Sequence, residues 1–173
     1  MALEIERRFL VRGESWRKHV LWSQRLEQAY LPSSSAAMTL RVRRAGPENA
    51  WFTLKFPGEG IARHEFEYAI PEADACALLE RCPAVLSKCR YGLDLSGGEW
   101  VLDVFEGLNS PLVIAEVELE EPDQSLVIPP WCVEEITALG AFSNAALSQE
   151  PFSSWPSLEQ QRWRQLLADQ EAP

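Results

Sequence analysis

Pairs of like-charged residues, spaced two positions apart, are the residues of this chain with the clearest potential for chemistry. Near the N-terminus, residues 3–11 carry Glu4, Glu6 and Arg8 with other residues between them. Because side chains alternate between the two faces of a strand, both carboxylates and the guanidinium would lie on one face. Carboxylate pairs are oxygen ligands for Mg²⁺ or Mn²⁺, and arginine binds phosphate oxygens through two parallel hydrogen bonds. This spacing could therefore hold a metal ion beside an anion.

The same spacing returns in later segments, with one sign of charge in each segment. The charged residues at these positions are Arg41 and Arg43, Lys55, Glu65 and Glu67, Lys88 and Arg90, Asp103, and Glu116 and Glu118. Cross-strand stability favours mixed charges, so like charges crowded on a sheet need something between them. A polyphosphate needs both direct cations and a divalent metal before a nucleophile can attack phosphorus. The two sets of side chains together could bind and cleave a chain of phosphates.

An ordinary interpretation competes with this one. The faces opposite the charges are apolar, for example Phe52, Leu54 and Phe56, and such alternation is typical of an antiparallel sheet with one face in water. If the sheet instead curled into a barrel, the charges would line a polar lumen that must be wet or filled with ligand and metal. Periodicity alone does not distinguish the open sheet from the closed one.

The elements that would position these residues are mostly strands joined by tight turns. Strands are predicted at residues 3–11, 25–31, 38–45, 50–56, 63–70, 85–95, 99–107 and 112–120. Helices are predicted at residues 13–22, at 72–82 after Pro71, and at 157–170, where Ser157 and Gln160 have capping-box spacing. Tight turns make neighbouring strands antiparallel, so the predicted fold class is α+β with a largely antiparallel sheet.

The composition is that of a globular chain without a general affinity for nucleic acid. Its 173 residues, 46% of them hydrophobic, fit a single domain spanning residues 1–173. The net charge of −10 argues against a nucleic-acid binder, although a local cluster of arginines could still bind an anionic ligand. Four cysteines without a C-x-x-C pair, and only two histidines, argue against a zinc site.

No membrane association is expected from the sequence. Charged residues at positions 4 and 6–8 interrupt the N-terminus where the apolar segment of a signal peptide would have to be. No stretch approaches the roughly 18–20 apolar residues that a membrane span needs. We therefore expect a soluble cytoplasmic protein.

The order of the charged motifs resembles that of the CYTH family, the triphosphate tunnel metalloenzymes. The segment "EIERRFLV" is similar to the N-terminal E-x-E-x-K signature of this family, with Arg8 in place of the lysine. R-x-R, T-x-K, R-x-E-x-E, K-x-R, D-x-F and E-x-E follow in the family's order, and "FSNAALS" resembles its usual tail, so that the resemblance extends from residue 3 to about 147. It implies an eight-stranded antiparallel β-barrel, or tunnel, with flanking helices, which binds triphosphate and Mg²⁺ or Mn²⁺.

The resemblance also implies a role for each charged residue. The residues implied as metal ligands are Glu4, Glu6, Asp103, Glu116 and Glu118. The residues implied along the phosphate path are Arg8, Arg41, Arg43, Lys55, Arg63, Lys88 and Arg90. Glu65 and Glu67 would hold the basic groups in place or contact a second metal. Tyr30 matches a family tyrosine that, next to Lys88, would orient or deprotonate water; a tyrosine packed at the barrel mouth is the alternative.

Short bacterial members that begin similarly are mostly similar to inorganic triphosphatases, so the expected reaction is the hydrolysis of tripolyphosphate to pyrophosphate and phosphate. A class IV adenylate cyclase, a thiamine or nucleoside triphosphatase, and a non-catalytic polyphosphate-binding module are the alternatives. The expected partner is a small-molecule triphosphate, with neither nucleic acid nor membrane. The sequence leaves the oligomeric state open, a homodimer included.

Overall fold

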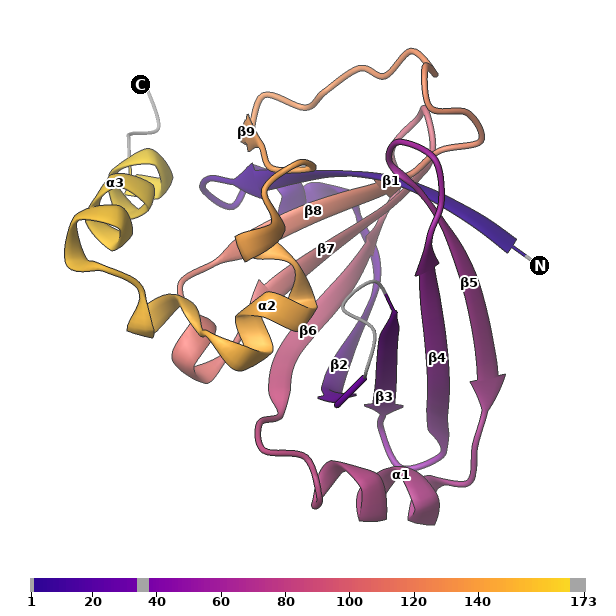
Figure 1. Cartoon of the computed structure of the whole chain (residues 1–173). Helices are drawn as coiled ribbons and strands as arrows, with labels where there is room; N and C mark the ends of the chain where they lie inside the picture. The colour runs from indigo at the N-terminus through magenta and orange to yellow at the C-terminus, as the bar shows by residue number, and fades with distance from the viewer. Residues whose placement is uncertain (1, 34–37, 169–173) are drawn as a thin grey trace.

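The computed structural model describes residues 2–33 and 38–168. Its strands are β1 (Ala2–Val11), β2 (Val20–Leu31), β3 (Thr39–Ala45), β4 (Asn49–Pro57), β5 (Ala62–Ala69), β6 (Leu86–Leu93), β7 (Glu99–Phe105), β8 (Val113–Glu118) and β9 (Cys132–Glu135). Its helices are α1 (Glu72–Leu79), α2 (Asn144–Gln149) and α3 (Ser157–Ala168), with short 3₁₀ helices η1 (Ser15–His19), η2 (Gly107–Asn109), η3 (Gly140–Phe142) and η4 (Phe152–Ser154). Figure 1 shows the strands curving around one another with the helices outside them.

The sheet closes on itself through the first strand. Eight antiparallel strands follow the order β5-β4-β3-β2-β6-β7-β8-β1, and the first residues of β1 pair back with β5, from Ala2 opposite Glu65 to Ile5 opposite Ala62. Further along, β1 pairs with β8 on one edge and with the added strand β9 on the other. The predicted eight-stranded antiparallel barrel is confirmed, and β9 is an addition that the sequence did not predict.

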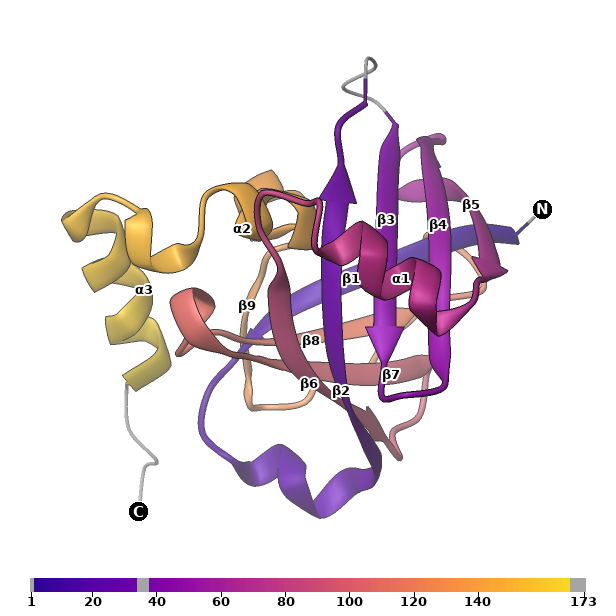
Figure 2. The same ribbon diagram turned by 90° about the horizontal axis from the view of Figure 1, so that it is seen from below.

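The apolar faces of the strands point outward, where many of their side chains are buried. On β1, Ile5, Phe9 and Val11 pack in a cluster that includes Trp16 of η1 and Trp100 of β7. Burying an aromatic or branched side chain contributes roughly 1.5–3 kcal/mol, so this outer layer provides much of the stability of the fold. On another side, α1 lies across the outer face of β2, β3 and β4 (Figure 2). With the apolar faces covered from outside, the charged faces are left to point inward.

One end of the barrel interior is apolar and filled. Leu10 continues the inward face of β1 beyond Arg8, and it is buried with Phe105 and Ile114 against the segment that follows β9. From that segment, the Phe142 ring packs edge-on against Trp155 and Trp163, with ring centroids 5.0 and 4.9 Å away. The polar part of the interior therefore ends at an apolar plug.

Two local predictions are wrong. Residues 13–22 do not form one helix, because η1 ends at His19 and the next three residues begin β2. There the Trp22 ring lies against Gly92 of β6, where a Cβ atom would come within 2.1 Å of Trp22 Nε1. Long-range pairing with β6 thus overrides the helical pattern.

The predicted capping box at the start of α3 is also wrong. The helix begins at Ser157 as predicted, but the backbone N–H of Gln160 donates to Pro156 O, which places the N-cap at Pro156 and not at Ser157. The Gln160 side-chain amide donates instead to the carbonyl oxygens of Ser153 and Trp155, at 3.0 and 2.7 Å. The last predicted helical residues, 169–170, lie outside the described residues.

No helix within residues 2–33 and 38–168 is long and apolar enough to cross a membrane.

Candidate active site

A cavity of about 800 Å³ lies within the barrel, lined by side chains from seven of its eight strands. The predicted site residues that line it are Glu4, Glu6, Arg8, Tyr30, Arg41, Arg43, Lys55, Arg63, Glu65, Glu67, Arg90, Glu116 and Glu118. Strand alternation places them there, because each belongs to the inward face of its strand. The structure thus brings together segments that are more than 100 residues apart in sequence.

The basic side of the cavity is built on β3 and β4 and is held by the carboxylates of β5. Glu67 accepts hydrogen bonds from Arg41 Nη2 at 3.1 Å and Arg43 Nη2 at 3.0 Å. Lys55 Nζ lies 2.6 Å from Glu4 and 2.9 Å from Glu65. Burial, and then the neighbouring Arg41, lower the pKa of Arg43 to about 10. A bound anion would relieve this crowding of cations.

Two predicted residues, Lys88 and Asp103, do not line the cavity. Asp103 is fully buried behind Arg90, and its two oxygens accept from Arg90 Nε at 2.8 Å and Arg90 Nη2 at 2.7 Å. Lys88, 1% exposed, donates to the same carboxylate. Burial opposes ionisation of Asp103, but Arg90 and Lys88 outweigh it and lower its pKa to about 2. This placement differs from the metal-ligand role expected for Asp103, whose oxygens both hold cations.

The acidic side of the cavity contains carboxylates with few cationic partners. Glu6 and Glu118 stand directly opposite each other on β1 and β8. The nearest cation to Glu6 is Arg8 at 3.7 Å, and Glu118 has no ion pair within the described parts of the chain. Burial, followed by Glu116, raises the pKa of Glu6, and burial, followed by Glu99, raises that of Glu118. Burial also raises the pKa of Glu4 to about 7, despite its contact with Lys55.

These carboxylates suit a divalent cation, although they do not form a closed cage. In residues 2–33 and 38–168, no three His, Cys, Asp or Glu side chains converge on one point. Mg²⁺ keeps several water ligands and is commonly held by one or two carboxylates together with substrate phosphates. The facing pair of Glu6 and Glu118 meets that requirement, because a cation between them would replace repulsion with attraction. The five-residue metal shell implied by the resemblance is therefore not preformed.

Tyr30 is placed as a hydrogen-bond donor. Its hydroxyl accepts from Gln28 Nε2 at 2.7 Å, which leaves its own proton free to donate. Burial raises the pKa of Tyr30 to about 12. A phenol that holds its proton this firmly is a poor base, so the expected deprotonation of water by Tyr30 is not supported.

Lys88, which was expected next to Tyr30, donates hydrogen bonds to Asp103 and, at 3.1 Å, to Asn144.

The segment between β9 and α2 also lines the cavity, which sequence reasoning missed. The fork of Arg8 fastens this segment to β1, donating to Phe142 O at 3.1 Å and Thr137 O at 3.2 Å. A lysine has no such fork, so the arginine at this position has a structural use. The segment brings Thr137, Ser143 and Asn144 to the cavity. The resemblance of "FSNAALS" to the family tail was the available signal, but no spacing indicated that it faces the strands.

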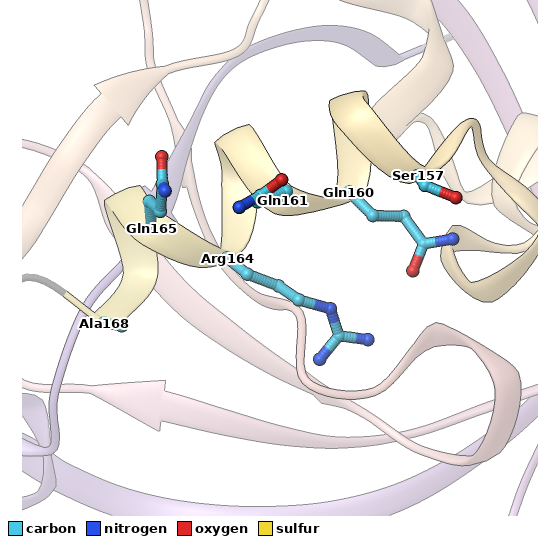
Figure 3. A pocket seen from close by; sticks show the side chains of 6 residues that line it. All are labelled: Ser157, Gln160, Gln161, Arg164, Gln165 and Ala168. Carbon is cyan, nitrogen blue, oxygen red and sulfur yellow. The ribbon is translucent and has the colours of Figure 1, made fainter.

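A second concave surface lies along α3 and is a weaker candidate. It encloses about 390 Å³ and is lined by Ser157, Gln160, Gln161, Arg164, Gln165 and Ala168. Figure 3 shows these side chains spread along one helix, where they do not converge. Arg164 is the single charge among them, so this surface lacks the paired acids and bases of the barrel cavity.

Comparisons with known proteins agree with this geometry. A family model for the CYTH domain matches residues 2–150. An inorganic triphosphatase of Acetivibrio thermocellus is 34% identical over 162 residues, which cover 90% of this chain and 99% of the relative. One of Nitrosomonas europaea is 37% identical over 152 residues, which cover 84% and 96%. A crystal structure of an inorganic triphosphatase is 33% identical with a TM-score of 0.64, covering 90% of this chain and 98% of that one. The chain belongs to the CYTH domain family.

Proposed function

We propose that this protein hydrolyses inorganic tripolyphosphate to pyrophosphate and phosphate in the barrel cavity, with Mg²⁺ or Mn²⁺. The observation that carries the proposal is the balance of charge in the cavity lining, where six carboxylates face six cations. A lining with no net charge does not attract a polyanion by itself, so a divalent cation on the carboxylates would be needed to bind one. The relatives named as inorganic triphosphatases match over nearly their whole length, which supports the same substrate here.

Basic side chains in the cavity bind the phosphates and stabilise the transition state. Arg41, Arg43 and Lys55 hold the phosphate oxygens, the two arginines through bidentate hydrogen bonds. Arg90, oriented by Asp103 and Glu116, stabilises the charge that develops on the transferring phosphoryl group.

Carboxylates on β1 and β8 would hold the metal, which when bound supplies charge neutralisation and a water of lowered pKa. Glu6 and Glu118 are the proposed ligands, with Glu4 and Glu116 beside them. Tyr30 donates a hydrogen bond to the water or to a phosphate oxygen. Water then attacks the terminal phosphorus in line with the leaving pyrophosphate.

A triphosphate with an organic group is the second candidate, because the cavity continues into a recess. The recess, of about 250 Å³, shares Thr39, Lys55 and Arg63 with the main cavity and is also lined by Phe56. A heterocycle could stack on that ring. The proposal favours inorganic triphosphate because the two curated relatives carry that name.

A substrate and metal panel tests the proposal. Purified protein is assayed with tripolyphosphate, thiamine triphosphate and ATP, each with Mg²⁺, with Mn²⁺ and with EDTA, and the products are resolved by ³¹P NMR. We expect tripolyphosphate to be the best substrate, pyrophosphate and phosphate to form in equal amounts, and EDTA to abolish turnover. Cyclic AMP as the main product, or unchanged turnover in EDTA, would overturn the proposal.

Replacing Tyr30 by Phe should lower kcat for tripolyphosphate by about 10-fold, the effect of losing one hydrogen bond to a charged acceptor. Loss of a general base would cost about 10²–10⁴-fold. We expect the pH–rate profiles of both proteins to have the same shape up to pH values near 10. Tyr68→Phe, on the outer face of β5 and 56% exposed, is the control. A larger loss, together with the disappearance of a rise in rate toward alkaline pH, would restore Tyr30 as a base.

A further inference from the structure

The first residue of α2 contributes a side chain that the reaction above does not use. Asn144 lines the cavity together with its neighbours Ser143 and Ala145. The side chain is half-buried, and its Oδ1 atom accepts a hydrogen bond from Lys88 Nζ at 3.1 Å. Asn144 is thus in contact with a buried lysine on one side and with the cavity on the other.

The lysine fixes the direction in which the amide faces. An ammonium group has three donors and no acceptor, so it can bond only to the carbonyl oxygen of an asparagine. The Nδ2 group is consequently turned away from Lys88. In residues 2–33 and 38–168 no acceptor pairs with it. A pre-oriented donor at the wall of the cavity is left without a partner among these described residues.

The chemistry of the cavity indicates what that donor would bind. Three acceptors in the neighbouring segment are already engaged, since Phe142 O and Thr137 O accept from Arg8, and the Ser143 hydroxyl accepts from the N–H of Ala146. A phosphate oxygen is an acceptor of high charge density, and a hydrogen bond to such a group is stronger than one between neutral partners. A neutral amide adds this bond without adding a seventh cation to the six in the lining.

We propose that Asn144 is a further substrate-binding residue, whose Nδ2 donates to a terminal oxygen of the bound triphosphate. Lys88 is its positioning residue, which turns the amide toward the substrate and makes no contact with the substrate itself. This inference rests on the proposed function, because it requires a chain of phosphates in the cavity. This role is consistent with the burial of Lys88, which is only 1% exposed and does not line the cavity.

The test measures binding of a methylene-bridged, non-hydrolysable analogue of tripolyphosphate by calorimetry in the presence of Mg²⁺. Asn144→Ala should weaken binding by about 10-fold, as expected for a lost hydrogen bond to a charged acceptor. Asn144→Asp should weaken it further, because a carboxylate there pairs with Lys88 and repels phosphate. Gln149→Ala, exposed at the other end of α2, is the matched control and should bind as the wild type does.

A double-mutant cycle separates positioning from a structural role of Lys88. Lys88→Met should weaken analogue binding in the wild-type background and have no further effect in the Asn144→Ala background, because the two residues act as a unit. Equal losses in both backgrounds would overturn the positioning role. If Lys88→Met does not fold, the side-chain amide resonance of Asn144 in the wild type tests the proposed contact with the substrate: it should shift when the analogue binds.

The outcomes distinguish this inference from the proposed function. A wild-type protein that binds the analogue and hydrolyses tripolyphosphate, with Asn144→Ala indistinguishable from it, overturns the role of Asn144 alone. A wild-type protein that neither binds the analogue nor hydrolyses tripolyphosphate overturns the proposed function and this inference with it. An Asn144 amide resonance that does not respond to bound analogue overturns the proposed contact.

Discussion

Replacing Glu6 by Gln should lower kcat for tripolyphosphate by at least about 100-fold, because the proposed metal ligand is lost from a site that must neutralise a polyanion. Glu6 stands opposite Glu118 with its nearest cation 3.7 Å away, so its charge is only weakly compensated by the protein. Gln has nearly the same size but carries no charge, and it removes the repulsion between the two carboxylates. Glu4→Gln should also lower kcat, and in addition it releases Lys55 from one of its two partners.

Binding of the triphosphate should change far less than turnover in these variants. Glu6→Gln leaves in place the arginines and Lys55 that are proposed to hold the phosphates, and it leaves five carboxylates facing six cations in the lining. At saturating Mg²⁺, Kd should therefore remain within about threefold of the wild type, whereas the Mg²⁺ concentration for half-maximal rate should rise at least about 10-fold. Glu120→Gln is the matched control, because this exposed residue continues the same spacing beyond β8. Equal losses of binding and turnover, or wild-type turnover, would refute the metal-ligand assignment.

Asp103→Asn should reduce the free energy of unfolding by about 3–5 kcal/mol, the cost of leaving buried cations without their partner. Asp103 is 0% exposed and accepts hydrogen bonds from both Arg90 and Lys88. Within residues 2–33 and 38–168 it is the only fully buried carboxylate. An asparagine amide keeps the shape but cannot balance two positive charges. For a chain of this length the midpoint of thermal unfolding should fall by roughly 6–20 °C.

An ion pair near the surface is the control for the loss of the buried charges. Arg7 and Glu135 approach to 2.6 Å, but their side chains are 23% and 42% exposed. Breaking that pair with Arg7→Ala should cost no more than about 1 kcal/mol. Urea unfolding of the three proteins provides the measurement. An Asp103→Asn variant as stable as Arg7→Ala would show that the Arg90–Asp103–Lys88 group contributes little to the fold.

The strands could be predicted from the sequence because alternation is a local property. Residues such as Glu4, Glu6 and Arg8 specify a strand and divide it into two faces without any knowledge of its neighbours. Closure of the sheet depends on Ala2 to Ile5 pairing with β5, about 60 residues away, and no local pattern records that contact. The helical prediction for residues 13–22 was wrong for the same reason, since Trp22 is placed by Gly92.

The sequence predicted most residues of the site, but it did not predict which of them line the cavity and which are buried behind its wall. Lys88 and Arg90 have the same spacing as the other pairs, and only the filled end of the barrel buries the first of them while leaving the second in the cavity. Asp103 likewise has the residue type of a metal ligand, yet its oxygens are taken by two cations. Asn144 carries no charge and belongs to no alternating segment, so its place in the cavity could not be deduced.

The pairing of β1 has a consequence for how the protein is made. β1 leaves the ribosome before its partners β5, β8 and β9, which all follow it in the sequence. The two hydrogen bonds of the Arg8 fork join residues 129 and 134 positions apart, and contacts of such high sequence separation slow folding. A nascent chain therefore carries the arginines of β3 on an open sheet, and the enclosed cavity comes into existence only when the segment after β9 docks on β1.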